Sequence, residues 1–252
     1  MSFKSLYENL DTEDLTSHYH YLAPLCRLQE TVALCLEASP QQMLDIGCGD
    51  GILLAILRDL AKANKGAQFV GIDLSEGRLR RAYKRIGPTV SCADAACLPF
   101  AAEVFDLCLC AEVLEHLPDP DAALAEWRRV TRTGGHLVLT VPIVGWSRWI
   151  EARLTGRVRF LNEVEHLREY APVQVKRCVL ISELIRALER AGWRVVSQRG
   201  IYYFPHRGER LWNALFHRQF LFRIASSIDH WLGGRPGLVG WGRYLALTCV
   251  RT

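Results

Sequence analysis

The chain has 252 residues, of which half are hydrophobic and 23% are charged, and its formal net charge is +4. This composition excludes a disordered, collagen-like or low-complexity protein. A charge this small does not by itself indicate nucleic acid as a partner. Charged residues interrupt the apolar stretches before the ~18 residues that a membrane span requires, and the first residues lack the apolar core of a secretory signal. We therefore expect a cytoplasmic protein.

Nine cysteines are scattered along the chain, without a Cys-x-x-Cys pair or a Cys/His cluster at zinc spacing. We therefore predict no metal site and interpret the cysteines as buried free thiols. Cys108 and Cys110 lie two residues apart in an apolar run. They should share one face of a strand, because side chains alternate along a strand.

Strand-like and helix-like segments alternate along most of the chain, which predicts an α/β fold with a doubly wound parallel sheet. The glycine pair Gly134–Gly135 should end one segment before the fifth strand begins. The predicted strands are Met43–Cys48, Phe69–Leu74, Val90–Ala93, Phe105–Cys110, His136–Val141, Trp193–Phe204 and Arg243–Val250. The predicted helices are Ile52–Asn64, a helix from Ser75, a helix from Pro120 to about Thr131, and Ser182 to Gly192.

Capping residues mark the predicted helix boundaries. Ser75 and Ser182 can each act as an N-cap, and Asp119 precedes Pro120 in the order that favours a helix start. Gly192 should close the helix that Ser182 opens.

Two stretches, 143–178 and 205–242, do not follow the alternation of strands and helices. They contain five of the seven tryptophans, and each carries a net charge of +3, which leaves −2 for the rest of the chain. We expect them to be insertions outside the sheet core.

The run from Met43 to Ile52 reads Met-Leu-Asp-Ile-Gly-Cys-Gly-Asp-Gly-Ile. A strand enters a glycine loop here and a helix leaves it, an arrangement that brings backbone amides close to a ligand. A dinucleotide fingerprint has glycines at its first, third and sixth positions. Counted from Gly47, the sixth position is Ile52, so the spacing argues against a pyrophosphate ligand.

Two aspartates follow the next predicted strands. Asp73 ends the second strand, where a carboxylate can accept hydrogen bonds from both hydroxyls of a ribose. Asp94 follows the third strand, where its side chain and the adjacent backbone can bind an adenine amino group. Together with the glycine loop, these residues indicate a nucleoside-containing cofactor.

At this point the sequence resembles the class I S-adenosylmethionine-dependent methyltransferases, in particular the small-molecule family that includes quinone-type methyltransferases. The resemblance covers residues 43–142 and is weaker at 166–170 and 182–196. It implies S-adenosyl-L-methionine as the cofactor and a seven-stranded, mostly parallel sheet whose last strand is antiparallel. The matching motifs are Leu44–Gly51, Asp73, Asp94–Phe100, Glu112–Leu117 and Trp127–Gly135.

The resemblance also implies one methyltransferase domain over residues 1–252, with a helical lid in 1–40 and an acceptor lid formed by 143–178 and 205–242. Asp45 can instead brace the glycine loop without touching the ligand, Asp73 can be a solvated carboxylate, and the backbone beside Asp94 can bind adenine alone. The implied cofactor-binding residues are Asp45, Gly47, Cys48, Gly49, Asp73, Leu74, Asp94, Ala95 and Glu112.

The acceptor should lie near the end of the fourth strand, close to Glu112 and His116. Methyl transfer is an in-line displacement, so the enzyme mainly positions the acceptor and excludes water, and an acceptor that loses a proton also needs a base. Glu112, His116 and His166 are the candidate catalytic residues. Each has a structural alternative: a solvent-facing Glu112, a packed His116, and a lid salt bridge at His166.

Missing motifs narrow the acceptor class. Ala111–Leu114 stands where methyltransferases acting on the amino groups of nucleic-acid bases have an Asn/Asp-Pro-Pro-aromatic tetrad, and Leu109 stands where a Pro-Cys nucleophile has proline. The double-glutamate loop of arginine methyltransferases is not matched either. We expect a hydrophobic small molecule or lipid-linked acceptor and no nucleic acid. A quinone-biosynthesis C- or O-methyltransferase is a narrower alternative, and a non-catalytic cofactor-binding scaffold is a different one.

An apolar stripe recurs every four residues in the second insertion, at Trp212, Phe216, Phe220, Ile224 and Ile228. This spacing predicts one apolar helix face. The face can dock on the protein's own core, or it can form a lid that admits an apolar acceptor. Nearby arginines make peripheral contact with an anionic inner membrane surface a further expectation.

Overall fold

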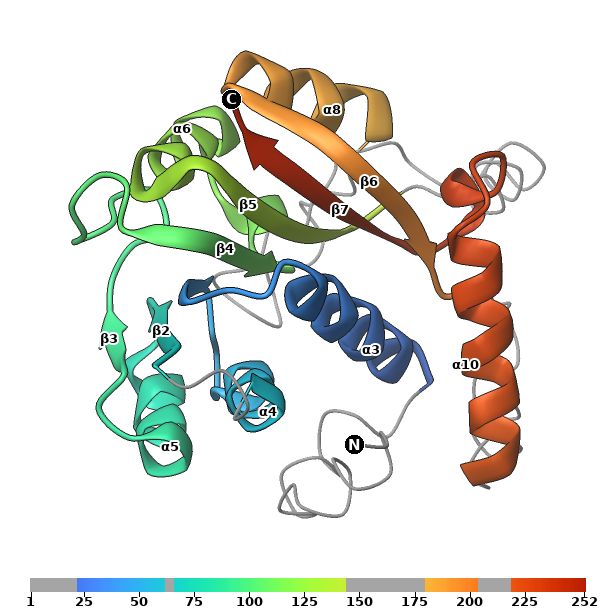
Figure 1. Ribbon diagram of the computed structural model, residues 1–252, viewed down its shortest axis with the longest axis horizontal. Helices are drawn as coiled ribbons and strands as arrows, with labels where there is room; N and C mark the ends of the chain where they lie inside the picture. Colours follow the sequence, from blue (N-terminus) through green and yellow to red (C-terminus); the bar gives the residue numbers. More distant parts are fainter. Residues whose placement is uncertain (1–21, 62–65, 144–179, 204–218) are drawn as a thin grey trace, which may run out of the picture.

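The computed structural model describes residues 22–61, 66–143, 180–203 and 219–252. Its centre is a seven-stranded sheet in the order β3-β2-β1-β4-β5-β7-β6 (Figure 1). The first five strands pair in parallel, and β7 is antiparallel to both β5 and β6, as the resemblance implied. The strands are β1 (Gln42–Ile46), β2 (Gln68–Asp73), β3 (Val90–Cys92), β4 (Phe105–Ala111), β5 (Thr131–Pro142), β6 (Trp193–Ile201) and β7 (Tyr244–Arg251).

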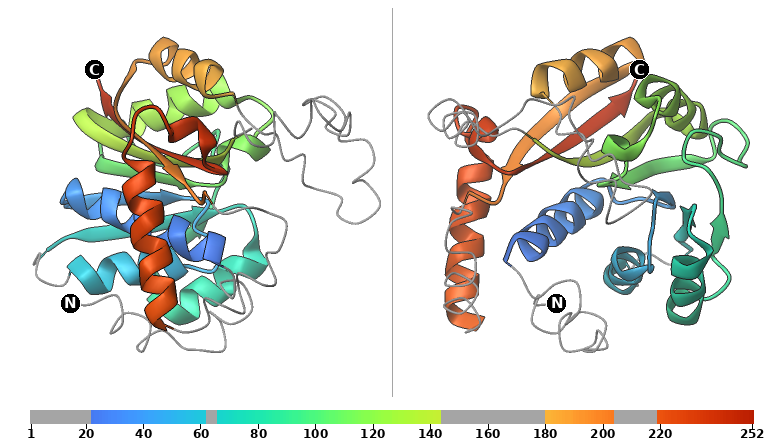
Figure 2. Two further views of the ribbon diagram at one scale, coloured as in Figure 1. Left: turned by 90° about the vertical axis from the view of Figure 1, so that its right-hand side faces the viewer. Right: turned by 180° about the vertical axis from the view of Figure 1, so that it is seen from behind.

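Helices cover both faces of the sheet, so the doubly wound α/β prediction is confirmed (Figures 1 and 2). One face carries α3 (Leu22–Glu37), α4 (Ile52–Leu60) and α5 (Glu76–Ile86). The other carries η2 (Leu114–His116), α6 (Pro120–Val130) and α8 (Ile181–Arg190). Near the end of β6, α10 (Gln219–Gly233) packs against α3, and η4 (Val239–Trp241) leads into β7.

The central strand β4 contributes to the cores on both faces of the sheet. Leu107 and Leu109 pack on the α3 and α4 side, whereas Cys108 and Cys110 pack on the α6 and α8 side. The prediction that the two cysteines share a face is therefore confirmed. Burial raises the pKa of the Cys108 thiol to about 12, which keeps it protonated.

The interpretation of the cysteines as buried thiols is wrong at two positions. Cys92, at the end of β3, and Cys97, in the loop that follows, are both exposed. The strand β3 is the edge of the sheet and only three residues long, and its last two residues are exposed. The other described cysteines are buried, and Cys178 lies outside the described residues.

Two of the three predicted N-caps are confirmed. The side chains of Ser75 and Asp119 accept hydrogen bonds from backbone N–H groups in the first turns of α5 and α6. The prediction for Ser182 is wrong, because α8 begins at Ile181. The carbonyl of Leu180 already accepts the first backbone hydrogen bonds of that helix.

The glycine pair Gly134–Gly135 lies inside β5 and does not precede it. The strand begins at Thr131 and pairs with Phe105 before its register shifts. Gly134 has φ +77, and a Cβ on Gly135 would lie 2.8 Å from the carbonyl oxygen of Arg132. The glycines therefore allow a β-bulge in a continuous strand.

Only parts of the expected lids are described. Of residues 1–40, α3 and the turn before β1 are described, and residues 1–21 lie outside the described part. Residues 144–179 and 204–218 also lie outside it, which includes Trp212 and Phe216. No helix in the described ranges is long and apolar enough to cross a bilayer.

Candidate cofactor and acceptor site

The loop between β1 and α4 turns at the carboxyl edge of the parallel strands. Gly47 and Gly49 have φ values of +78 and +55, in the region that favours glycine. A Cβ on Gly47 would lie 2.2 Å from Cγ2 of Val113, so the loop lies directly against the segment after β4. The N–H groups of Gly47 and Cys48 both donate to the carbonyl of Ile72 at 2.8 Å. The end of β2 therefore fixes the loop.

Asp73 joins the ends of β1 and β2. Its Oδ2 accepts a hydrogen bond from the N–H of Gly49 at 2.9 Å, and its Oδ1 accepts one from the N–H of Ser75 at 2.8 Å. Each carboxylate oxygen can accept a further bond, so Asp73 keeps the capacity to bind ribose hydroxyls. The next residue, Leu74, is 70% exposed and offers an apolar surface beside this carboxylate.

The loop after β3 is anchored to α6. The indole N–H of the fully buried Trp127 donates to the carbonyl of Ala95 at 2.8 Å. Oδ1 of Asp94 accepts a hydrogen bond from the N–H of Ala96 at 2.8 Å, and the carboxylate of Asp94 is exposed. The loop therefore presents a carboxylate at the strand end beyond Asp73.

Asp45 lies inside β1 and is almost completely buried. Burial, with a smaller contribution from the charge of Asp73, raises the pKa of its carboxyl to about 7. Within the described ranges no donor hydrogen-bonds this carboxyl, and the glycine loop is held by Ile72 and Asp73. A deeply buried carboxyl at this edge of the sheet is consistent with a cationic ligand group beside it.

Glu112 directly follows β4 and has a left-handed backbone, with φ +59. Its N–H donates to the carbonyl of Thr140 at 3.0 Å, and its Oε2 lies 3.1 Å from Nη1 of Arg27. Residues other than glycine rarely adopt such a φ, and those that do are concentrated at functional sites. The neighbouring strand and α3 therefore hold this carboxylate at the edge where the cofactor loop lies.

His116 ends η2, one turn after Glu112. Its Nε2 lies 3.9 Å from Oε1 of the fully buried Glu115. His166 lies outside the described residues. The structure therefore brings Asp45, Asp73 and Glu112 to one edge of the sheet and places His116 next to them. In the described part of the chain, no three His, Cys, Asp or Glu side chains are grouped as metal ligands.

Sequence reasoning missed the residues that α3 and β7 contribute. The guanidinium of Arg27 pairs with Glu112 and lies over the ring of Tyr244, 5.0 Å from its centroid. The only sequence signal was the position of Arg27 in the expected lid. Spacing along the chain cannot show which strand end a lid residue reaches.

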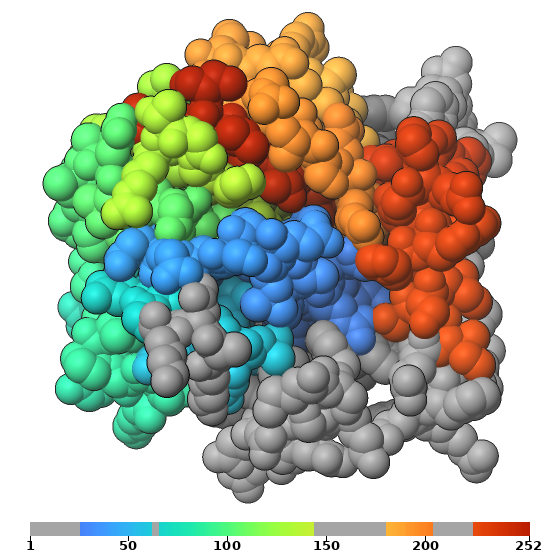
Figure 3. All heavy atoms as spheres, in the orientation of Figure 1, coloured from blue at the N-terminus to red at the C-terminus, as the bar shows by residue number. Residues whose placement is uncertain are grey.

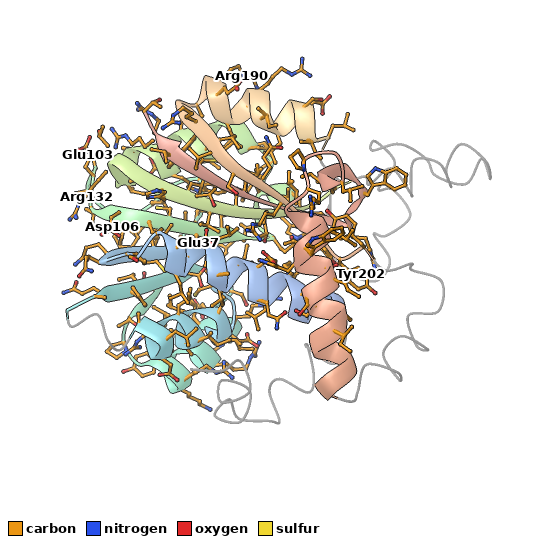
Figure 4. The ribbon with its side chains drawn as sticks, turned by 45° about the vertical axis from the view of Figure 1, so that its right-hand side comes forward. Glu37, Glu103, Asp106, Arg132, Arg190 and Tyr202 are labelled. Atoms are coloured by element: carbon orange, nitrogen blue, oxygen red, sulfur yellow. The ribbon has the colours of Figure 1, made fainter. Side chains whose placement is uncertain are left out.

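A second contact that the sequence did not reveal lies at the end of β6. Tyr202 is buried and has φ +63, and its N–H and that of Tyr203 each donate to the carboxylate of Asp229 at 2.9 Å. Figure 4 shows Tyr202 beside α10, whereas Glu103 and Asp106 lie at the opposite end of the sheet. Asp229 therefore fastens α10 to the same edge of the sheet as the candidate site.

Comparison with known proteins identifies the family. Residues 44–139 match a family model described as a methyltransferase domain. The ubiquinone biosynthesis O-methyltransferase of Aromatoleum aromaticum is 31% identical over 173 residues, which are 66% of this chain and 69% of the relative. The chain belongs to the class I S-adenosylmethionine-dependent methyltransferases. The resemblance seen in its motifs is thereby confirmed.

Solved structures agree with this methyltransferase fold. A Thermotoga maritima S-adenosylmethionine-dependent methyltransferase has a TM-score of 0.61 at 17% identity, covering 98% of this chain and 99% of its own. Phosphoethanolamine N-methyltransferase 2 of Haemonchus contortus, solved with S-adenosyl-L-methionine, has a TM-score of 0.57 at 20% identity, covering 88% of this chain and 52% of its own.

The cofactor of this methyltransferase is S-adenosyl-L-methionine, and the geometry of the site fits it. The glycine loop leaves no room for a Cβ at Gly47, and Asp73 is oriented by two backbone N–H groups. At the same edge of the sheet, Leu74 offers an exposed apolar side chain and Asp45 a buried carboxyl.

Proposed function

We propose that this methyltransferase methylates a hydrophobic small molecule or a lipid-linked acceptor. A narrower version of the proposal is that the acceptor group is a ring hydroxyl of a quinone precursor. The observation that carries the proposal is the identity of 31% to a relative named as a ubiquinone biosynthesis O-methyltransferase. The missing nucleic-acid and arginine methyltransferase motifs favour the same acceptor class.

We assign the cofactor contacts by the position of each residue along the sheet edge. Asp45, with the loop of Gly47, Cys48 and Gly49, receives the methionine moiety, because a buried carboxyl suits its ammonium group. Asp73 receives the ribose hydroxyls, and the apolar side chain of Leu74 covers the base. The adenine amino group is received by Asp94 and Ala95.

Bound S-adenosylmethionine supplies an electrophilic methyl group on a sulfonium. The residues of this chain orient the acceptor, exclude water and accept its proton. Glu112 is the leading base, because its carboxylate is held at the end of β4. His116 and His166 are the alternatives, and each would act through an imidazole nitrogen.

The test of acceptor class is to incubate the purified chain and methyl-labelled cofactor with cell extract. Label in the organic phase is expected for a quinone precursor or a lipid-linked acceptor. Label in polar metabolites contradicts the proposed acceptor class, and no label with intact cofactor binding favours the scaffold alternative. Glu112→Gln should lower the rate by roughly 10²-fold or more without weakening the cofactor, whereas unchanged rates would remove Glu112 as the base.

We also propose that α10 rests on an anionic membrane surface. Ile224, Ile228 and Trp231 are 42%, 47% and 57% exposed, and their spacing puts them on one face of the helix. The guanidinium of Arg235 stacks over Trp231 at 4.4 Å. Of the stripe residues that the structure describes, Ile224 and Ile228 do not dock on the protein's own core, whereas α10 packs inward through Ala225. Exposed apolar and aromatic groups beside a cation suit a lipid interface.

The membrane proposal is tested by sedimentation with phosphatidylglycerol vesicles. The double variant Ile224→Ser/Ile228→Ser should lose most of the binding with little change in melting temperature, because both side chains are exposed. Val196→Ser, a change of an exposed valine on β6, is the matched control and should bind as the wild type does. Equal binding by the double variant and the control would contradict the proposal.

A further inference from the structure

Arg27 links the cofactor side of the sheet edge to the strands beyond it. Its Nη1 lies 3.1 Å from Oε2 of Glu112, and its guanidinium lies 5.0 Å from the ring centroid of Tyr244. Glu112 follows β4 and Tyr244 begins β7, so Arg27 extends across the end of β5, which lies between them. Figure 3 shows the atoms of α3, which carries Arg27, beside those of α10.

The surroundings of Arg27 combine partial access with shielding from bulk water. The side chains of Arg27 and Glu112 are 23% and 13% exposed. Ion pairs are stronger in such a setting than on an open surface, because less water screens the charges. A planar guanidinium also binds oxyanions directionally and stacks on aromatic rings.

We propose that Arg27, backed by the ring of Tyr244, binds the reacting oxygen of the acceptor in its ionised form. The acceptor would then be a phenol or an enol, whose hydroxyl is acidic enough to ionise beside a cation. This inference rests on the proposed function and deepens it, because it names the acid–base class of the acceptor. Arg27 is a substrate-binding residue under this assignment, and Tyr244 positions it.

The proton balance of the transfer is consistent with this arrangement. The acceptor O–H bond breaks and its proton moves to the carboxylate of Glu112. The oxygen forms a bond to the methyl carbon, the carbon–sulfur bond breaks, and its electron pair stays on sulfur to give S-adenosylhomocysteine. Negative charge thus moves from Glu112 to the acceptor oxygen beside the same guanidinium, and release of the proton to solvent later restores the Arg27–Glu112 pair.

The chain offers a matched control for Arg27. Arg199 on β6 also pairs with a glutamate, Glu30 of α3, with its Nη1 3.3 Å from Oε2 of Glu30, and its side chain is 24% exposed. Each arginine therefore pairs with a glutamate, one member of each pair lies on α3, and the exposures of the two arginine side chains are 23% and 24%, but of the two only Arg27 pairs with Glu112. A merely structural ion pair should respond alike at both positions.

The experiment uses 4-nitrocatechol, whose ionisation is read from its visible absorbance, bound to the full chain with S-adenosylhomocysteine. In the wild type and in Arg199→Gln, the pKa of the bound probe should lie about one pH unit or more below that of the free probe, which equals tenfold preference for the ionised form. In Arg27→Gln the pKa should return to the free value. Arg27→Lys, which keeps the charge, should retain much of the lowering.

Several outcomes would overturn the inference. They are an equal pKa in the wild type and Arg27→Gln, binding of the neutral probe alone, and no binding of the probe by the wild type. If Arg27→Gln does not fold, the test is made with Arg27→Lys. A probe that is bound to Arg27→Lys with the pKa of the free probe then overturns the assignment. Calorimetry with S-adenosylhomocysteine distinguishes failure of the proposed function from failure of the Arg27 inference. No binding of S-adenosylhomocysteine by the wild type contradicts the proposed function. Normal binding, together with an unshifted pKa of the bound probe, overturns only the role of Arg27.

Discussion

Asp45 and Asp73 lie on neighbouring strands but differ in their surroundings. Asp73 accepts two backbone hydrogen bonds, from Gly49 and Ser75. Asp45 is buried beside that charge, and its pKa is raised to about 7. A cationic group bound next to Asp45 would favour its ionised form, so ligand binding and proton release should be coupled at this residue.

The first prediction concerns pH and cofactor affinity. S-adenosylmethionine should bind more tightly as the pH rises from about 6 to about 8, because Asp45 ionises over this range and pairs with the ammonium group. Below that range binding should release a proton, which calorimetry in buffers of different ionisation enthalpy detects. Asp45→Asn should remove both the pH dependence and the proton release. A pH dependence that persists in this variant would assign the titration to another group.

The same carboxyl makes a second, opposite contribution in the protein without ligand. Its pKa is raised above the ordinary value of 3.8 to about 7, so the folded state holds the proton that the unfolded state has lost. The contribution of Asp45 to the free energy of unfolding is therefore greatest at low pH and falls as the pH rises from about 4 to about 7. Denaturant titrations of the wild type and Asp45→Asn should show this difference.

The next prediction concerns Asp73. Asp73→Ala should weaken S-adenosylmethionine by roughly 1–3 kcal/mol, the scale of losing charge-assisted hydrogen bonds to a ligand. The melting temperature should also fall, because the N–H groups of Gly49 and Ser75 lose their acceptor. Asp73→Asn keeps one acceptor oxygen and should have intermediate effects. Unchanged cofactor affinity in Asp73→Ala would contradict the assignment of Asp73 to the ribose.

At the scale of elements, α10 is joined to the rest of the fold by polar side chains. The carboxylate of Asp229 accepts two backbone N–H bonds at the end of β6, and Glu30 of α3 pairs with both Arg199 and His230. The apolar residues on the opposite face of α10 can therefore remain exposed without loosening the helix. The exposed Ile224 and Ile228 and the docked Asp229 thus lie on different faces of the same helix.

We predict that Asp229→Ala lowers the free energy of unfolding by roughly 2–5 kcal/mol, because it leaves buried N–H groups without an acceptor. The control is Asp121→Ala. Asp121 forms an exposed ion pair with Arg190 on the surface, so this variant should lose less than about 1 kcal/mol. Urea unfolding measures both. Similar losses in the two variants would mean that Asp229 does not fasten α10.

How much the sequence could predict depends on whether a feature is local. The caps at Ser75 and Asp119 act within one helical turn, so their prediction succeeded. The start of β5 was misplaced because a bulge looks like a turn until the partner strand is known. The reach of Arg27 and the exposure of Ile224 depend on contacts between distant segments, which spacing along the chain does not encode.

At the scale of the whole molecule, the cofactor should stabilise the fold, since the site proposed for it is formed by the loops after three strands. At a hundred times its dissociation constant, a ligand adds about 2.7 kcal/mol. For a chain of this size that raises the melting temperature by roughly 5–10 °C. NADH should give no shift, because Ile52 replaces the third glycine of a dinucleotide fingerprint. Thermal denaturation with S-adenosylhomocysteine and NADH compares the two, and a shift with NADH alone would contradict the assignment.

The strand β7 is made after β6 but lies between β5 and β6. Its residue Arg251 reaches back to the carbonyl of Thr131, 120 residues earlier in the chain. During synthesis on the ribosome, the edge of β5 that pairs with β7 therefore remains unpaired until β7 has emerged. The strand β6 cannot join the sheet before then. Open edges pair readily with other chains, and contacts of such long range form slowly. The nascent chain should consequently be most prone to aggregation, and most dependent on chaperones, in the interval between synthesis of β5 and β7.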